Sequence, residues 1–116
     1  MNFEFDMTRK SIPQGDMYLI PIKAVPHDAE QVSAVNGHFI ITHSETGHNH
    51  IIEERPDIRQ FSGMDMFRGF LEVGFGADLK HLRHHHTHET QHVPAGAWLI
   101  QRQAAYTPKG WERARD

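Results

Sequence analysis

Cysteine is absent from this chain of 116 residues, which excludes disulfides, thiol nucleophiles and thiolate metal sites. Long apolar runs are absent too, since no stretch approaches the roughly 20 residues that a membrane helix needs. Residues 1–10 carry acidic side chains where a secretory signal peptide has positive charge and an apolar core. These three absences predict a cytoplasmic protein with no membrane span.

The chain also lacks an excess of basic residues. The 12 Lys and Arg are outnumbered by 15 Asp and Glu, and the formal net charge is −3. The sequence pI of about 6.4 is far from the basic footprint of a nucleic-acid-binding domain. Basic residues and tryptophans that would form a small patch are Lys80, Arg83, Lys109, Arg113, Arg115, Trp98 and Trp111. Nucleic acid is therefore not the expected partner.

Glycine and proline are scattered through the chain and leave only short segments between them. Hydrophobic residues make up 38% and charged residues 23%, a balance typical of one folded domain over residues 1–116. Residues 1–14 are expected to form an N-terminal arm or edge strand, and residues 107–116 a C-terminal tail. Short segments between turn residues favour strands over long helices.

Five segments have the length and composition of strands: residues 16–25, 38–43, 48–53, 64–75 and 97–106. Pro21 predicts that the first is an edge or bulged strand. The second and third are expected to form a hairpin across residues 44–47. Apolar side chains of both parities in the fourth predict a strand covered on both faces. Together they predict an antiparallel all-β domain, a small barrel or sandwich.

Residues 77–90 fit two interpretations. As a helix, which would be the one short helix of the domain, the segment would align its histidines 81, 84, 85 and 88 on one face. As an extended segment it would align histidines 84, 86 and 88 instead. Because its neighbours have the pattern of strands, a strand passing into a loop is the preferred interpretation.

Histidine is the residue that the chain has in excess. Eleven are present, and ten fall in two groups, His38–His50 and His81–His92. Neutral imidazole is the commonest metal ligand in proteins, and a structural role rarely needs ten histidines in two clusters. The sequence therefore predicts a shared metal site.

Spacing selects four ligands from these groups. On a strand, His48 and His50 point to the same face with Cα atoms about 6.5 Å apart, close enough to converge on one ion. His85 and His88 meet on a helical turn or across a tight loop. Four histidines give either a closed site or three ligands and an open position. The expected cofactor is a divalent transition metal, zinc first, with iron, manganese, nickel and copper left open.

Four other histidines and two glutamates are not expected to be metal ligands or are left undecided. His38 and His43 are expected on the surface face of a strand, and His81 and His92 are left undecided. If the metal activates water, Glu54 or Glu89 is the candidate general base, although surface glutamates more often serve solubility. No nucleophile elbow, P-loop or dinucleotide fingerprint is present.

The order of short motifs resembles a group of uncharacterised proteins found in phages, prophages and plasmids. The motifs here are Gly15-Asp16, Gly47-His48-x-His50, His85-x-x-His88, Pro94-x-Gly96 and Arg102-Gln-x-x-Tyr-x-Pro108. The resemblance covers most of the chain from Gly15 and singles out the same four histidines. It implies a mobile-element origin, with the host cytoplasm as location, and no particular activity.

A second resemblance is to cupins, whose first motif has H-x-H followed by glutamate. His48-x-His50 with Glu54 matches that spacing, and Pro94-x-Gly96 is similar to part of the second motif. Thr42 and Leu99 stand where the cupin motifs have a glycine and a ligand histidine. This resemblance implies a metal held inside a small β-barrel.

Three classes of function remain open at this point. The first is a metal-dependent protein, enzymatic or not. The second is a non-enzymatic binding or structural module, with a homo-oligomer or a host or virion protein as partner. In that case an N-terminal arm led by Phe3 and Phe5 would pair two copies. Nucleic-acid binding is the third and least favoured class.

Overall fold

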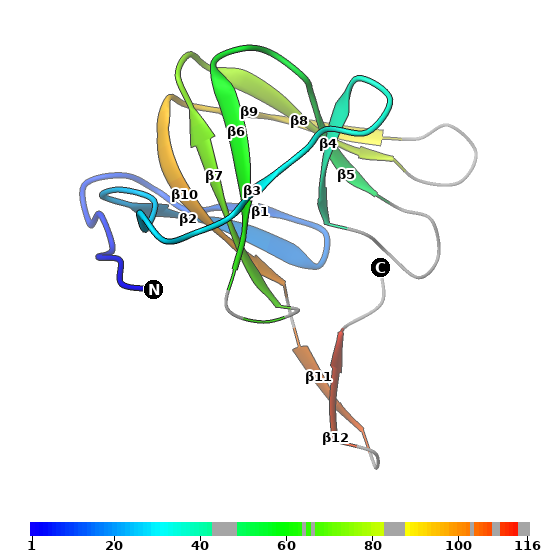
Figure 1. Ribbon diagram of the computed structural model, residues 1–116. Coiled ribbons are helices and arrows are strands. Elements are labelled where there is room, and N and C mark those ends of the chain that lie inside the picture. The colour runs from blue at the N-terminus through cyan, green and yellow to red at the C-terminus, as the bar shows by residue number, and fades with distance from the viewer. Residues whose placement is uncertain are drawn as a thin grey trace.

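The computed structural model describes residues 1–42, 49–63, 65, 67–82, 88–102, 104–107 and 110–113. Of these, 82, 88–89, 104–107 and 110–113 are described by their backbone alone. In these ranges every regular element is a strand, and none is a helix. Apart from a separate two-stranded hairpin, these strands form two antiparallel sheets packed against each other as a small sandwich (Figure 1). The all-β prediction is confirmed.

The larger sheet has six strands in the spatial order β1-β2-β10-β7-β6-β3. Their bounds are β1 Ile12–Gln14, β2 Met17–Ile22, β10 Gly96–Arg102, β7 Arg68–Val73, β6 Ile58–Ser62 and β3 Gln31–Val32. Every neighbouring pair is antiparallel. The prediction of an edge or bulged first strand is wrong, because β2 pairs with β10 on one side and β1 on the other, and both registers are continuous. Pro21 lies beyond the stretch Met17–Leu19 that pairs with β1. On that side it faces the N-terminal arm, where its carbonyl accepts a hydrogen bond from the backbone N–H of Asp6 at 2.9 Å.

The smaller sheet has four strands in the order β4-β5-β8-β9. They are β4 His38–Thr42, β5 His50–Glu53, β8 Ala77–Leu82 and β9 His88–Val93. The hairpin of β4 with β5 is confirmed, and residues 77–82 are a strand rather than a helix. A separate hairpin pairs β11, Ala104–Thr107, with β12, Gly110–Arg113. The segment expected as one strand over 97–106 is thus divided between β10 and β11.

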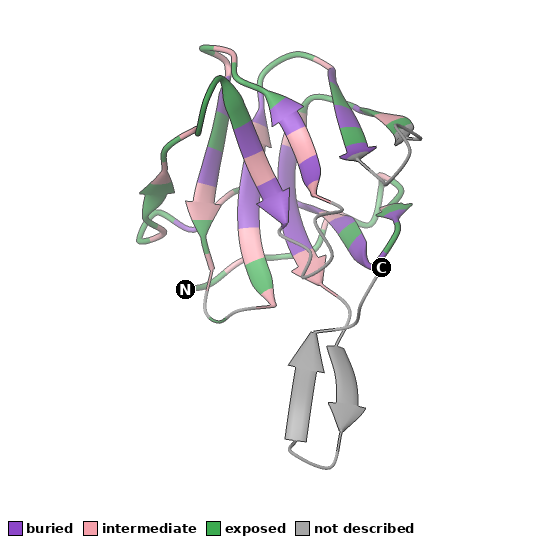
Figure 2. Cartoon of the chain, turned by 90° about the vertical axis from the view of Figure 1, so that its right-hand side faces the viewer, coloured by how far each residue is buried: buried purple, intermediate pink, exposed green. Residues whose placement is uncertain are grey.

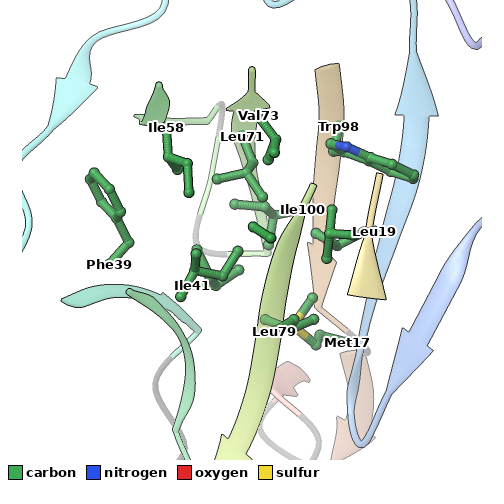
Figure 3. Packing of buried hydrophobic residues seen from close by; sticks show 13 residues of the cluster. Met17, Leu19, Phe39, Ile41, Ile58, Leu71, Val73, Leu79, Trp98 and Ile100 are labelled. Atoms are coloured by element: carbon green, nitrogen blue, oxygen red, sulfur yellow. The ribbon is translucent and has the colours of Figure 1, made fainter. Parts of the chain in front are cut away.

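The main hydrophobic core fills the space between the two sheets (Figure 3). Met17, Leu19, Leu71, Trp98 and Ile100 reach it from the six-stranded sheet, and Phe39, Ile41, Ile52 and Leu79 from the four-stranded one. Burial alternates along β5 and β6 (Figure 2), as expected when one face of a strand points into a core, whereas β10 has four consecutive buried residues.

The outer face of the six-stranded sheet is covered as well. A second buried cluster there contains Ile22, Phe70 and Leu99, and Phe3 of the N-terminal arm packs against it. The ring centroids of Phe3 and Phe70 are 5.6 Å apart in an edge-to-face arrangement. The central strands are therefore buried on both faces, as predicted for β7. Within one chain the arm lies on its own sheet, and a homo-oligomer stays a prediction.

Arg9 fastens this arm to the sheet. Its Nη2 donates to the carbonyls of Ile22 and Ala97 at 2.8 and 3.0 Å, and its guanidinium lies 4.7 Å from the centroid of the Trp98 ring. Asp6 accepts a hydrogen bond from Nε at 2.9 Å. No helix among the described residues has the length and apolar character needed to cross a membrane.

Candidate functional site

Buried polar residues gather at one end of the space between the sheets. We call this group the polar cluster, and its members, each at most 7% exposed, are Gln14, Asp16, Thr42, His50 and His81. Two come from the six-stranded sheet and its first turn, and three from the four-stranded sheet. Burying a polar group costs free energy unless the group is hydrogen-bonded. We therefore take this concentration of buried polar side chains as the candidate functional site.

The turn between β1 and β2 brings two members of the polar cluster over the others. Gln14 pairs with Met17, so Gly15 and Asp16 form a two-residue hairpin connection with φ of +57° at Gly15. Glycine at the first position suits a type II′ turn. A Cβ atom on Gly15 would lie 2.6 Å from His81 Cε1 and 3.1 Å from His50 Cε1. Only glycine lets the turn close on the two imidazole rings.

The hydrogen bonds of Gln14 determine the orientation of His50. The amide Nε2 of Gln14 donates to the carbonyl of Leu79 at 3.0 Å, so its oxygen Oε1 is the atom that faces His50. His50 Nδ1 lies 2.8 Å from that oxygen. An amide oxygen only accepts hydrogen bonds, which assigns the proton to Nδ1 and leaves Nε2 as the atom available to a different partner.

That partner is Asp16, whose Oδ1 lies 3.0 Å from His50 Nε2. The side chains of His50 and Asp16 are 0% and 8% exposed. Because Nδ1 already carries a proton, this contact needs a positive charge between the nitrogen and the carboxylate. A second proton or a metal cation would supply it. The geometry is therefore that of a buried histidine–carboxylate pair that joins the two sheets.

The ring of His81 stacks on the ring of His50. The two residues are cross-strand partners on β5 and β8, and their rings stack with centroids 3.9 Å apart and planes inclined by 15°. Imidazole nitrogens bind in the plane of the ring, so the nitrogens of two stacked rings bind in two separate, nearly parallel planes. His81 supports the His50 ring and does not converge with it on one ion.

Thr42 completes a polar row across the inner face of the four-stranded sheet. It is the β4 partner of His50, and partners across a strand pair present their side chains to the same face. The hydroxyl oxygen of Thr42 is buried and has no hydrogen-bond partner within the described ranges. A buried group of this kind in a native protein calls for a water molecule or an ion.

The structure describes two of the four histidines that were predicted as metal ligands. His50 lies in the polar cluster. His88 begins β9, where its backbone pairs with Leu82, while His48 and His85 lie outside the described residues. The pairs Thr42–His50, His50–His81 and Leu82–His88 bring the ends of all four strands of this sheet together. Both connections that carry the predicted ligands, residues 43–48 and 83–87, therefore start from the same end of the sheet.

Other predicted candidates lie away from the polar cluster. His38 is exposed, as expected, and His43 is outside the described residues. His92 is exposed, with its Nδ1 3.9 Å from Asp78 Oδ1, and Glu54 is exposed as well. The side chain of Glu89, on β9, is not described.

One of the two tryptophans in the predicted basic patch, Trp98, is not available to a base, and the side chain of the other, Trp111, is not described. Trp98 is 1% exposed, and its Nε1 donates to the carbonyl of Pro94 at 3.2 Å.

Sequence reasoning missed Gln14, Asp16 and Thr42 as members of the site. The dipeptide Gly15-Asp16 was one detectable signal, because a glycine followed by a polar residue between two apolar segments is typical of a hairpin turn. Nothing local to the sequence indicates that this turn closes on β5 and β8. Among the described residues no three His, Asp or Glu side chains form a group that would hold a metal by themselves.

A family model matches residues 13–103 of this chain. The matched range includes every member of the polar cluster and ends before the β11–β12 hairpin. No curated protein and no solved structure matches the chain. Since the matched range spans well over half of the sequence, the chain belongs to the family described as Domain of unknown function (DUF8820).

Proposed function

We propose that this protein binds a divalent transition metal at the end of the four-stranded sheet. The ligands are His48, His50, His85 and His88, and zinc is the favoured ion. The observation that carries the proposal is the strand register, which starts both histidine-bearing connections beside the buried His50. His50 and the start of β9 at His88 thereby lie at the same end of the sheet, although they are far apart in the sequence.

Two features of the polar cluster support the same proposal. The His50 ring is held by Gln14 through Nδ1, and metal-ligating histidines are commonly held in this way through the nitrogen that does not bind the metal. The buried hydroxyl of Thr42 has no partner in the described ranges, and a metal-bound water would satisfy it. The chemistry available, imidazole nitrogen and carboxylate oxygen without sulfur, suits zinc, iron, manganese, nickel and copper.

Elemental analysis of the full chain, purified without a histidine tag, tests the proposal. We expect about one equivalent of metal in the wild type and a loss in the His48→Ala and His85→Ala variants. His38→Ala is the matched control, because His38 is exposed and lies at the opposite end of β4. Substoichiometric metal that is equal in all four proteins refutes the proposal.

A further inference from the structure

The described residues that bear on this site come from both sheets, and one of them is not a histidine. Asp16 lies in the β1–β2 turn of the six-stranded sheet, whereas His50 begins β5 of the four-stranded sheet. We propose that Asp16 is an oxygen ligand of the metal, that His50 binds through Nε2 with Gln14 as its positioning residue, and that the ion links the two sheets. This inference rests on the proposed function.

The separation of the two donor atoms is the first argument. His50 Nε2 and Asp16 Oδ1 are 3.0 Å apart. Two donors at that separation can both lie about 2.1 Å from one ion, with an angle of about 90° at the metal. This is the angle between neighbouring ligands in five- or six-coordinate sites. An ion at these distances would lie beside the line that joins the two atoms and not between them, so the Asp16 carboxylate would rotate to admit it.

The second argument comes from the fixed orientation of the histidine. Gln14 is itself anchored to the carbonyl of Leu79, so its oxygen accepts from Nδ1 and directs Nε2 at Asp16. A ligand histidine held through its other nitrogen loses less freedom on binding metal. Gly15 keeps the turn close enough for this contact, and a side chain at that position would push the carboxylate away from the ring.

The third argument is the cost of the arrangement without an ion. His50 and Asp16 are both at least nine-tenths buried, and a buried ion pair commonly contributes little stability once desolvation is counted. The same residues together with a divalent cation form a site whose binding free energy adds to folding. A structural ion explains why a small domain retains two ionisable groups between its sheets.

Calorimetric titration of the apo full chain with Zn²⁺ tests this assignment. Asp16→Asn keeps the shape of the side chain and can donate a hydrogen bond from its amide to Nε2, but it replaces the carboxylate, and Gln14→Ala removes the positioning contact. The matched controls are Asp57→Asn and Gln60→Ala, because Asp57 is bound to Arg55 and Gln60 donates to Ile40, both outside the polar cluster. We expect Gln14→Ala to weaken Zn²⁺ binding by about 10–100-fold, Asp16→Asn by at least as much, and the controls by less than about twofold.

A second measurement needs no variant and so does not depend on Asp16→Asn folding. In the wild type, Zn²⁺ should shift the carboxyl ¹³C resonance of Asp16 and the ¹⁵N resonance of His50 Nε2, and leave Asp57 unchanged. If the wild type binds Zn²⁺ but Asp16 neither shifts nor affects affinity, the assignment of Asp16 is wrong while the histidine site stands. If the wild type binds no metal, both proposals fail and the pair is a structural hydrogen bond.

Discussion

Replacement of Gly15 by alanine tests the closeness of the β1–β2 turn to the two histidine rings. Two costs are expected. The positive φ of +57° costs a residue with a side chain about 1–2 kcal/mol. The new methyl group would approach His81 Cε1 to 2.6 Å and His50 Cε1 to 3.1 Å, and overpacking of this kind costs about 1–3 kcal/mol. The sum is about 2–5 kcal/mol, a large part of the stability of a small domain.

Gly37→Ala separates the two costs. Gly37 also has a positive φ, +80°, but a methyl group there meets no atom within 4 Å. We therefore expect Gly37→Ala to lose only about 1–2 kcal/mol, and the difference between the variants to be about 1–3 kcal/mol. Gly15→Ala should also shift the ring resonances of His50 and His81, whereas Gly37→Ala should not.

Urea unfolding of the apo protein, followed by far-ultraviolet circular dichroism, measures both variants against the wild type. The free energies of unfolding should differ as stated with the denaturant slope unchanged, since a change in midpoint at constant slope reports stability alone. Equal losses in the two variants, within about 0.5 kcal/mol, would refute the reasoning. They would mean that the turn does not press on the rings and that the polar cluster is more open than its burial indicates.

Three further predictions follow from the rest of the fold. Arg9→Ala should lower the free energy of unfolding by about 2–4 kcal/mol, because it removes two charged hydrogen bonds and the contact with the Trp98 ring, and Arg9→Lys should recover only part in the same urea assay. Leu79→Ala, at a fully buried position, should cost about 2–5 kcal/mol, with an unchanged melting temperature contradicting the core assignment. Hydrogen bonds from Thr8 and then Arg9 hold the pKa of Asp6 far below its ordinary value of 3.8. The stability from Asp6 is therefore present above about pH 4 and is lost as the pH falls toward the folded-state pKa, and Asp6→Asn should show less loss of the urea midpoint between pH 6 and pH 3.

Local patterns determined much of the fold. β-Branched and apolar segments of six to twelve residues, separated by glycine and proline, predicted strands at β2, β4, β5, β7 and β10, because side-chain alternation and turn chemistry act over neighbouring residues. The mixed parity of the β7 segment correctly predicted burial on both faces. β6 was missed, because the sequence Ile-Arg-Gln-Phe-Ser has only two apolar residues. Its pairing with β7 along its whole length stabilises it as a strand.

The histidine-rich composition by itself predicted a metal site and four ligands, and those four stay a prediction. Only the tertiary structure decided that His50 is buried and oriented by Gln14, that His81 stacks on it, and that Asp16 reaches it from the other sheet. The physical reason is that strand order and register depend on contacts between residues far apart in the sequence. A turn at residues 15–16 and a strand starting at residue 50 carry no local sign that they meet, so the chemistry of the polar cluster appears only once the two sheets are packed.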